Sequence, residues 1–318
     1  MTTVLLRFLT RTGVFVGSVA AASVVVFGFM AVLPGDPARI ALGVNATPAA
    51  VAQLRREFGT DRPMLAQYAD WARGLLVGDF GESYVTRAAI GPQVLDRLGV
   101  TLWLVGAAMV VAVLVAVPIG TVMAVRHRRP SGLALSALSQ FGIAVPAFLT
   151  GVLAVALFAV HLGWLPAGGY TPPAQDPVMF LRQLVLPAGA LGLAQAAILA
   201  RYVRTAVLDV LREDYLRTAR AKGLTLTRAL VRHGLRNAAI PISTVLGLQL
   251  ATLLVGAIVV ERVFVIPGLG SLLLDGVANR DLLLVQGVVM VLVVAVLVVN
   301  YLVDLLYAVL DPRLRRAT

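Results

Sequence analysis

Residues 209–241 hold the charged side chains that are best placed to bind a partner. Leucines recur at helical spacing on both sides of Gly223, which predicts two short helices joined by a left-handed turn at this glycine. Thr225 or Thr227 is expected to cap the second helix. With the residues just before it, the segment holds nine cations and three acids: Arg201, Arg204, Arg212, Arg217, Arg220, Lys222, Arg228, Arg232 and Arg236 against Asp209, Glu213 and Asp214.

Two kinds of partner fit a basic helical pair of this sort. It could enter a DNA groove as a helix-turn-helix, or it could lie between two membrane spans on the cytoplasmic side. The apolar runs that flank the segment are too long for a soluble core, which favours the membrane interpretation and leaves DNA binding as a minor alternative.

The sequence shows none of the common catalytic motifs. The single lysine, Lys222, follows Ala221 where a P-loop needs glycine, so ATP cannot bind by that route. Three separated histidines form no HExxH motif, and no G-x-S-x-G elbow occurs. The chain has no cysteine, which excludes disulfides, thiolate metal sites and a thiol nucleophile. An intramembrane hydrolase without such a motif stays open as a minor alternative.

The composition is that of a protein whose solvent is the membrane. Hydrophobic residues make up 59% of the 318 residues and charged residues 14%, against roughly a quarter charged in ordinary soluble domains. The mean hydropathy is +0.89. The apolar runs predict six spanning helices, because each meets or comes close to the length of about 20 residues that crosses a bilayer. These runs cover residues 12–33, 100–125, 133–160, 183–200, 237–260 and 282–303.

Pro118, Pro146 and Pro187 are among the prolines that lie inside these predicted spans. Neighbouring helices can satisfy the carbonyls that a proline leaves free, so each span is expected to continue through its proline. The first run could be a cleaved signal peptide, but L-P-G-D-P follows it in place of a small-residue cleavage site. We therefore interpret it as a retained first span.

The arginines predict the orientation in the membrane. Segments 1–12, 126–132, 201–240 and 309–318 carry most of the 27 Lys and Arg residues, which places them and both termini in the cytoplasm. Segment 34–97 has equal numbers of acidic and basic residues and is predicted to be a small extracytoplasmic region. Within it, Thr47 is expected to cap a helix that ends at Gly59, and residues 78–83 form a turn.

The predicted spans contain few ionisable residues, which bears on the transport mechanism. Asp304 lies near the inner end of the last span, where a helix-end pair is the simplest interpretation. A proton-coupled transporter would place a carboxylate near mid-membrane, and the sequence offers none there. Sodium sites built from carbonyl groups escape this test. A self-sufficient channel or secondary transporter therefore stays open as the alternative function.

Several motifs together resemble a known family. D-Y-L-R-T-A-R-A-K-G-L (214–224) followed by R-H-G-L-R-N-A-A-I-P-I (232–242) is similar to the cytoplasmic loop of bacterial ABC importer permeases, in particular the B-type subunit of the peptide/nickel branch. Where the wider superfamily has Glu-Ala-Ala, this chain has Arg217, Thr218 and Ala219, with Gly223 in register. The other matching motifs are L-P-G-D-P (33–37), G-D-F-G-E-S (78–83), E-R-V-F-V-I-P-G-L-G (261–270), R-D-L-L-L-V-Q-G (280–287) and N-Y-L-V-D-L-L-Y-A-V-L-D-P-R (300–313).

The resemblance implies an all-α polytopic membrane protein with six transmembrane helices of the type I ABC importer permease fold. Residues 1–33 would form the cytoplasmic N-terminus and first span, 34–97 the extracytoplasmic region, and 98–318 a five-helix core with a coupling loop at 208–241. The chain would be a permease of the bacterial cytoplasmic membrane that imports di- or oligopeptides or similar small solutes. It would catalyse no reaction and hold no cofactor or metal.

The resemblance also implies partners: a second, homologous permease, two ATP-binding cassette subunits that use ATP and Mg²⁺, an extracytoplasmic solute-binding protein and the lipid bilayer, but no nucleic acid. A short helix of the loop would enter a groove on the ATPase. The residues that carry over to this contact are Asp214, Tyr215, Arg217, Thr218, Ala219, Arg220, Ala221, Lys222, Gly223 and Leu224. No substrate-binding residue can be named, and segment 34–97 could contact the solute-binding protein or only pack on the spans.

Overall fold

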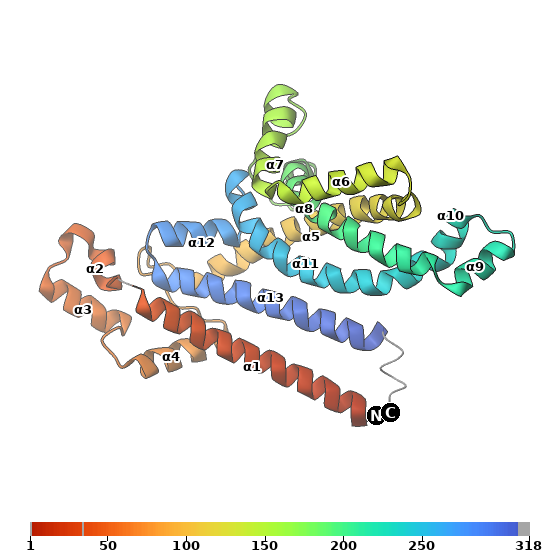
Figure 1. Cartoon of the computed structure of the whole chain (residues 1–318). Coiled ribbons are helices and arrows are strands. Elements are labelled where there is room, and N and C mark those ends of the chain that lie inside the picture. Colours follow the sequence, from red (N-terminus) through yellow and green to blue (C-terminus); the bar gives the residue numbers. More distant parts are fainter. Residues whose placement is uncertain (1, 34, 311–318) are drawn as a thin grey trace. The chain divides into compact units, whose positions relative to one another are not determined.

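The protein is almost entirely helical (Figure 1). The computed structural model describes residues 2–33 and 35–310, with only the backbone described for 2–7, 240, 304 and 306–310. In the described part, the β-structure is limited to one isolated antiparallel bridge between Glu82 and Ala89. The α-helices are α1 (Thr2–Val32), α2 (Pro37–Leu42), α3 (Pro48–Phe58), α4 (Met64–Val77), α5 (Ile90–Val125), α6 (Pro130–Ala144), α7 (Ala147–Ala154), α8 (Pro177–Leu211), α9 (Asp214–Ala221), α10 (Leu226–Ala229), α11 (Leu235–Val263), α12 (Leu269–Ala278) and α13 (Leu282–Leu310).

Three short helices of other types complete the chain. Gly43–Asn45 is a 3₁₀ turn after α2, and Val155–His161 and Leu230–Gly234 are π-helical segments that follow α7 and α10.

Five of the six predicted spans are single helices that are long and apolar enough to cross a membrane. They are Phe8–Val32, Ile90–Val125, Pro177–Leu211, Pro241–Val263 and Leu282–Val303. A sixth span results if the bent pair Pro130–Ala144 and Ala147–His161 crosses as one unit. The fold is therefore the predicted polytopic helical membrane protein.

The third predicted span differs from expectation, because it is not a continuous helix. Its two halves are bent by 96° at the break between Ala144 and Ala147. Val145 is extended, with ψ of 120°, and directly precedes Pro146. The proline ring disfavours helical geometry in the residue before it, so the helix ends there. Pro118 and Pro187, by contrast, lie inside α5 and α8 as predicted.

The chain divides into two compact units, one of Met1–Thr101 with Pro267–Tyr301 and one of Leu102–Ile266 with Leu302–Thr318. The first unit has a hydrophobic core to which α5, α12 and α13 contribute, with Ile90, Leu269 and Val288 fully buried. In the same unit α1 contacts α13, since the hydroxyls of Thr12 and Tyr301 lie 2.8 Å apart. Sequence-distant ends of the chain thus meet in one unit.

A smaller core lies under α2 and α3, where Ala38, Val51 and Leu54 are buried together. Both helices begin at side-chain caps. Asp36 accepts a hydrogen bond from the Ala38 amide at 3.1 Å, and Thr47 accepts one from the Ala50 amide at 3.3 Å. The cap of α3 and its end at Gly59, whose φ is 68°, confirm the helix predicted from the sequence.

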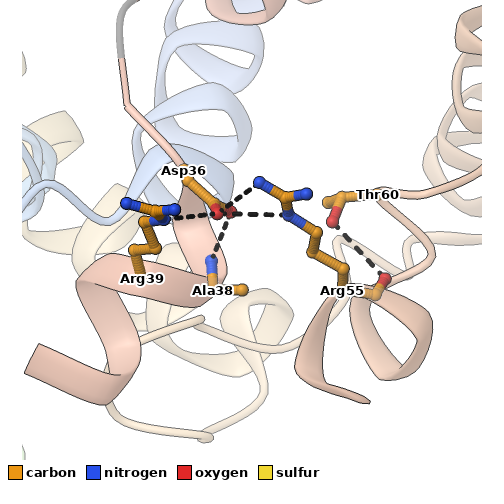
Figure 2. Close-up of polar contacts among 5 residues, drawn as sticks. All are labelled: Asp36, Ala38, Arg39, Arg55 and Thr60. Atoms are coloured by element: carbon orange, nitrogen blue, oxygen red, sulfur yellow. Dashed lines mark hydrogen bonds and ion pairs between the residues drawn. The ribbon is translucent and has the colours of Figure 1, made fainter. Parts of the chain in front are cut away.

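Asp36 also connects α2 to α3 through charged side chains (Figure 2). Arg55 donates two hydrogen bonds to its carboxylate, at 3.1 and 2.8 Å, and Arg39 lies 3.7 Å away. Partial burial raises the pKa of Asp36, but the hydrogen bonds from Arg55 and Ala38 and the two arginine charges outweigh it and hold the pKa below its usual value. Asp36 is therefore ionised at neutral pH, and it joins the start of α2 to Arg55 of α3.

The predicted turn at residues 78–83 is present and is tied to the start of α13. Gly78 and Gly81 both have φ of 78°, a conformation that glycine adopts without strain. The Ser83 hydroxyl donates to the buried carboxylate of Asp281, and the Tyr84 amide donates to the same carboxylate at 3.3 Å. Burial, and then the negative charge of Asp281, raises the pKa of Tyr84.

The second unit is built around α8 and α11, which lie side by side (Figure 1). Leu199, Val203 and Val207 of α8 are completely buried in its core. Glycines let α5 approach α8 closely. A Cβ on Gly120 would lie 2.6 Å from the Ala200 carbonyl oxygen, which is shorter than van der Waals contact allows. This packing holds the long helices that carry the basic segment.

Candidate functional site at the end of α8 and α11

The basic segment forms a small helical cap at the ends of α8 and α11 (Figure 1). α8 ends at Leu211, and α9 begins at Asp214. The carboxylate of Asp214 lies in the first turn of α9, where a negative charge interacts favourably with the helix dipole. α9 in turn lies against α10 and the π-helical segment that leads into α11. The predicted pair of short helices is confirmed.

The turn at Gly223 is left-handed, as the sequence predicts. Its φ is +90°, and a Cβ built on it would meet no atom within 4 Å. The Gly223 amide donates to the Arg220 carbonyl at 2.9 Å, and the Leu224 amide donates to the Ala219 carbonyl at 3.3 Å, so these bonds satisfy the last carbonyls of α9. The glycine is required by backbone geometry and not by lack of space.

Of the two candidate caps for the second helix, the structure uses Thr225. Its hydroxyl oxygen accepts a hydrogen bond from the Arg228 amide at 3.4 Å. Thr227 lies inside α10. Sequence spacing alone allowed both, since each threonine precedes residues with helical periodicity.

Only one side chain of α9 is buried. Leu216 is 1% exposed, whereas Arg217, Thr218 and Arg220 all lie on the surface. Tyr215 is 37% exposed and presents an aromatic ring beside these cations. Leu216 is therefore the one α9 side chain that enters the core, and the charged face of the helix stays exposed in this chain. Such a helix can insert into a groove on a partner.

A close contact beneath α9, which sequence reasoning missed, fixes the π-helical segment. A Cβ on Gly234 would lie 2.5 Å from the Leu230 side chain and 2.9 Å from the Val210 side chain, and both of these residues are buried in the core. An alanine here would therefore require the Leu230 and Val210 side chains to move. The signal was present in the motif R-H-G-L, but nothing in the sequence says which side chains crowd the glycine.

The cap is strongly electropositive. Residues 215–260 contain no aspartate or glutamate. The ion pair from Arg217 to Asp214 in α9 has an N–O distance of 3.2 Å and is exposed, so its contribution to stability is small. The remaining cations of α9 and α10 include Arg220, Lys222 and Arg228, which are exposed. This surface is complementary to an acidic protein rim or to phosphate groups.

The ten predicted contact residues thus lie together on one short stretch. Seven of them lie in α9, which spans Asp214–Ala221 and also contains the buried Leu216, and Lys222, Gly223 and Leu224 follow its end. The described residues contain no group of three or more His, Cys, Asp or Glu side chains that could hold a metal ion. The side chain of Asp304 lies outside the described residues, so its predicted helix-end pair stays a prediction.

Comparison with known proteins covers nearly the whole chain. Residues 116–316 match the family described as binding-protein-dependent transport system inner membrane component, and residues 5–105 match the N-terminal model of such membrane components. The chain is 42% identical over 294 residues to the glutathione transport system permease protein GsiC of Salmonella typhimurium, covering 92% of this chain and 93% of the relative. It is 41% identical over the same length to the GsiC protein of Escherichia coli K12.

A solved structure has a similar fold. The chain resembles one from inward-facing conformations of the MetNI methionine ABC transporter, with a TM-score of 0.57 and 17% sequence identity. The likeness covers 69% of this chain and 96% of that chain.

Proposed function

Because the chain belongs to the family of binding-protein-dependent transport system inner membrane components, and is an ABC importer permease of the peptide/nickel branch, we propose that it carries glutathione or short peptides of similar size across the cytoplasmic membrane. The observation that carries this proposal is the 42% identity to a glutathione permease along 92% of the chain. The helical fold with five apolar spans and one bent pair supports a translocation subunit.

We propose that α9 transmits the work of ATP hydrolysis from a separate ATPase subunit. The support is geometric: Leu216 is the buried side chain of α9, and the charged side chains of the helix are exposed. Because α9 also lies against the π-helical segment that leads into α11, a push on α9 would be passed directly to that spanning helix. The chain would then need no nucleotide site of its own, and ATP and Mg²⁺ would bind to the two ATPase partners.

The proposed assembly has a second permease and a solute-binding protein beside this chain. The permease pair would form the pathway, and the binding protein would deliver cargo to the side of residues 34–97. Both termini and the α9–α10 cap would face the cytoplasm, as the arginine distribution indicates. Such a complex alternates access by tilting rigid helices, without covalent chemistry in this chain.

The experiment that tests the function is reconstitution of the chain in liposomes with its co-purified permease, ATPase and binding-protein partners. We expect uptake of labelled glutathione or a short peptide that requires both ATP and the binding protein. Competition among unlabelled glutathione, dipeptides and a nickel chelate would rank the cargo classes. Downhill flux through the chain alone, without ATP, would instead support the channel or secondary-transporter alternative.

A further inference from the structure

The first unit contains a pocket outside the basic segment at α9 and α10. Its volume is about 570 Å³, a size typical of pockets that bind small organic molecules. The walls come from the end of α1, from α3 and α4, from the turn at residues 78–84 and from the start of α13. All of these segments belong to the same compact unit.

The floor of the pocket is formed by the ends of two spanning helices. Phe27 and Met30 lie in the last turns of the span Phe8–Val32, and Leu282 and Leu283 open the span Leu282–Val303. Phe27 also packs on Trp71 of α4, with ring centroids 5.8 Å apart. The pocket therefore adjoins the depth at which the hydrocarbon of the bilayer meets its headgroups, where tryptophan is enriched.

The polar groups of the pocket offer hydrogen-bond donors that lack acceptors. The indole Nε1 of Trp71 and the carboxamide Nε2 of Gln286 are buried and have no hydrogen-bond partner among the described residues. They are the two such atoms among the side chains that line this pocket. Gln286 is only 6% exposed. Buried donors without acceptors cost free energy. Binding of a ligand with an acceptor atom would therefore be favoured, if a small rotation of these side chains brings their N–H groups toward it.

A cation lies at the polar side of the same pocket. Arg62 donates to Asp70 at 2.6 Å and is about half exposed, with 52% of its side chain accessible. A guanidinium group has five N–H donors, and one carboxylate contact leaves several of them free to bind another anion such as phosphate.

We propose that this pocket binds a phospholipid of the leaflet that adjoins residues 34–97. One acyl chain would cover the apolar floor at Phe27 and Leu283, an ester carbonyl would accept from Trp71 and Gln286, and the phosphate would lie at Arg62. Ester and phosphate oxygens only accept hydrogen bonds, as the unpartnered nitrogens require. A peptide cargo brings N–H donors of its own, for which the unpartnered lining atoms provide no acceptor.

The test is the amount of phospholipid that the purified importer complex retains after delipidation in detergent, measured by native mass spectrometry. Ala31, an exposed α1 residue that lines the pocket, is replaced by phenylalanine to fill it. Ala21→Phe is the matched control, since Ala21 is also exposed on α1 but does not line the pocket. We expect at least a tenfold lower occupancy in Ala31→Phe and wild-type occupancy in Ala21→Phe.

A second variant keeps the proposal testable if Ala31→Phe does not assemble. Trp71→Phe preserves an aromatic ring and removes the donor, and should weaken the binding of added phospholipid about three- to tenfold, as expected for one hydrogen bond. Equal retention by wild type and Ala31→Phe would overturn the proposal. So would unchanged affinity in Trp71→Phe, or a wild-type pocket occupied by glutathione or peptide in place of phospholipid.

Discussion

Replacement of Gly223 by alanine should uncouple this permease from its ATPase without disturbing its insertion in the membrane. The φ of Gly223 is +90°, and a Cβ at that position would touch nothing within 4 Å. The whole penalty is therefore backbone strain, which for a residue with a side chain in a left-handed conformation is about 1–2 kcal/mol. That energy lowers the population of the native turn by a factor of about 5–30.

The matched control is Gly189→Ala, inside α8. A Cβ there also meets nothing within 4 Å, but the backbone is helical, so alanine should be neutral or stabilise the helix by about 0.5–1 kcal/mol. Both glycines have room for a Cβ, but only Gly223 has a positive φ. Gly223→Val adds a β-branched side chain at the strained position and should be worse than Gly223→Ala.

The assay is ATP-dependent uptake by the reconstituted complex, together with the fraction of ATPase that co-purifies with the permease. We expect Gly223→Ala to lose most of its uptake and to retain less ATPase, while Gly189→Ala behaves as wild type. Membrane levels of both variants should be equal. Wild-type uptake by Gly223→Ala would refute the role of this turn in presenting α9.

Three further predictions concern other parts of the chain. The folded pKa of Asp36 lies below the unfolded value of about 3.9, so ionised Asp36 stabilises the fold above that value and this contribution is lost as the pH falls through the folded pKa. Asp36→Asn keeps a capping oxygen and should remove this acid dependence from the hydrogen exchange of residues 37–59. Unchanged acid dependence in the variant would contradict the role of Asp36. Gly234→Ala should destabilise the second unit by about 1–3 kcal/mol through overpacking, measured as a lower melting temperature relative to the uncrowded control Gly28→Ala; equal melting temperatures would argue against the contact. Since the chain has no cysteine, an impermeant maleimide should label Thr60→Cys in intact cells and Thr218→Cys only after permeabilisation, and the reverse pattern would invert the proposed orientation.

Local features of the molecule were predictable because each depends on a few neighbouring residues. The apolar runs predicted the spanning helices, and Gly223 predicted the left-handed end of α9 from the requirement of that conformation for glycine. The helix from Thr47 to Gly59 followed from its cap and its terminal glycine. In each case hydrogen bonds and dihedral angles within a few residues decide the structure. The family could be predicted for a related reason, since its motifs are contiguous in the sequence.

Other features depend on contacts between distant residues. Pro146 breaks its span, whereas Pro118 and Pro187 lie within continuous helices, although the three looked alike in sequence. The crowding of Gly234 by Val210, and the hydrogen bond from Ser83 to Asp281, join positions that no periodicity relates.

The sequence by itself determined that this chain spans the membrane, where its basic helical cap lies and which family it resembles. Only the tertiary structure decided that Leu216 is the buried side chain of α9, that one predicted span is sharply bent, and that a pocket with unpartnered donors is lined by the ends of α1 and α13. The physical reason is the distance along the chain between the residues that interact. Hydropathy and backbone conformation are properties of short segments, whereas burial, crowding and cavities arise only when separate helices pack against one another.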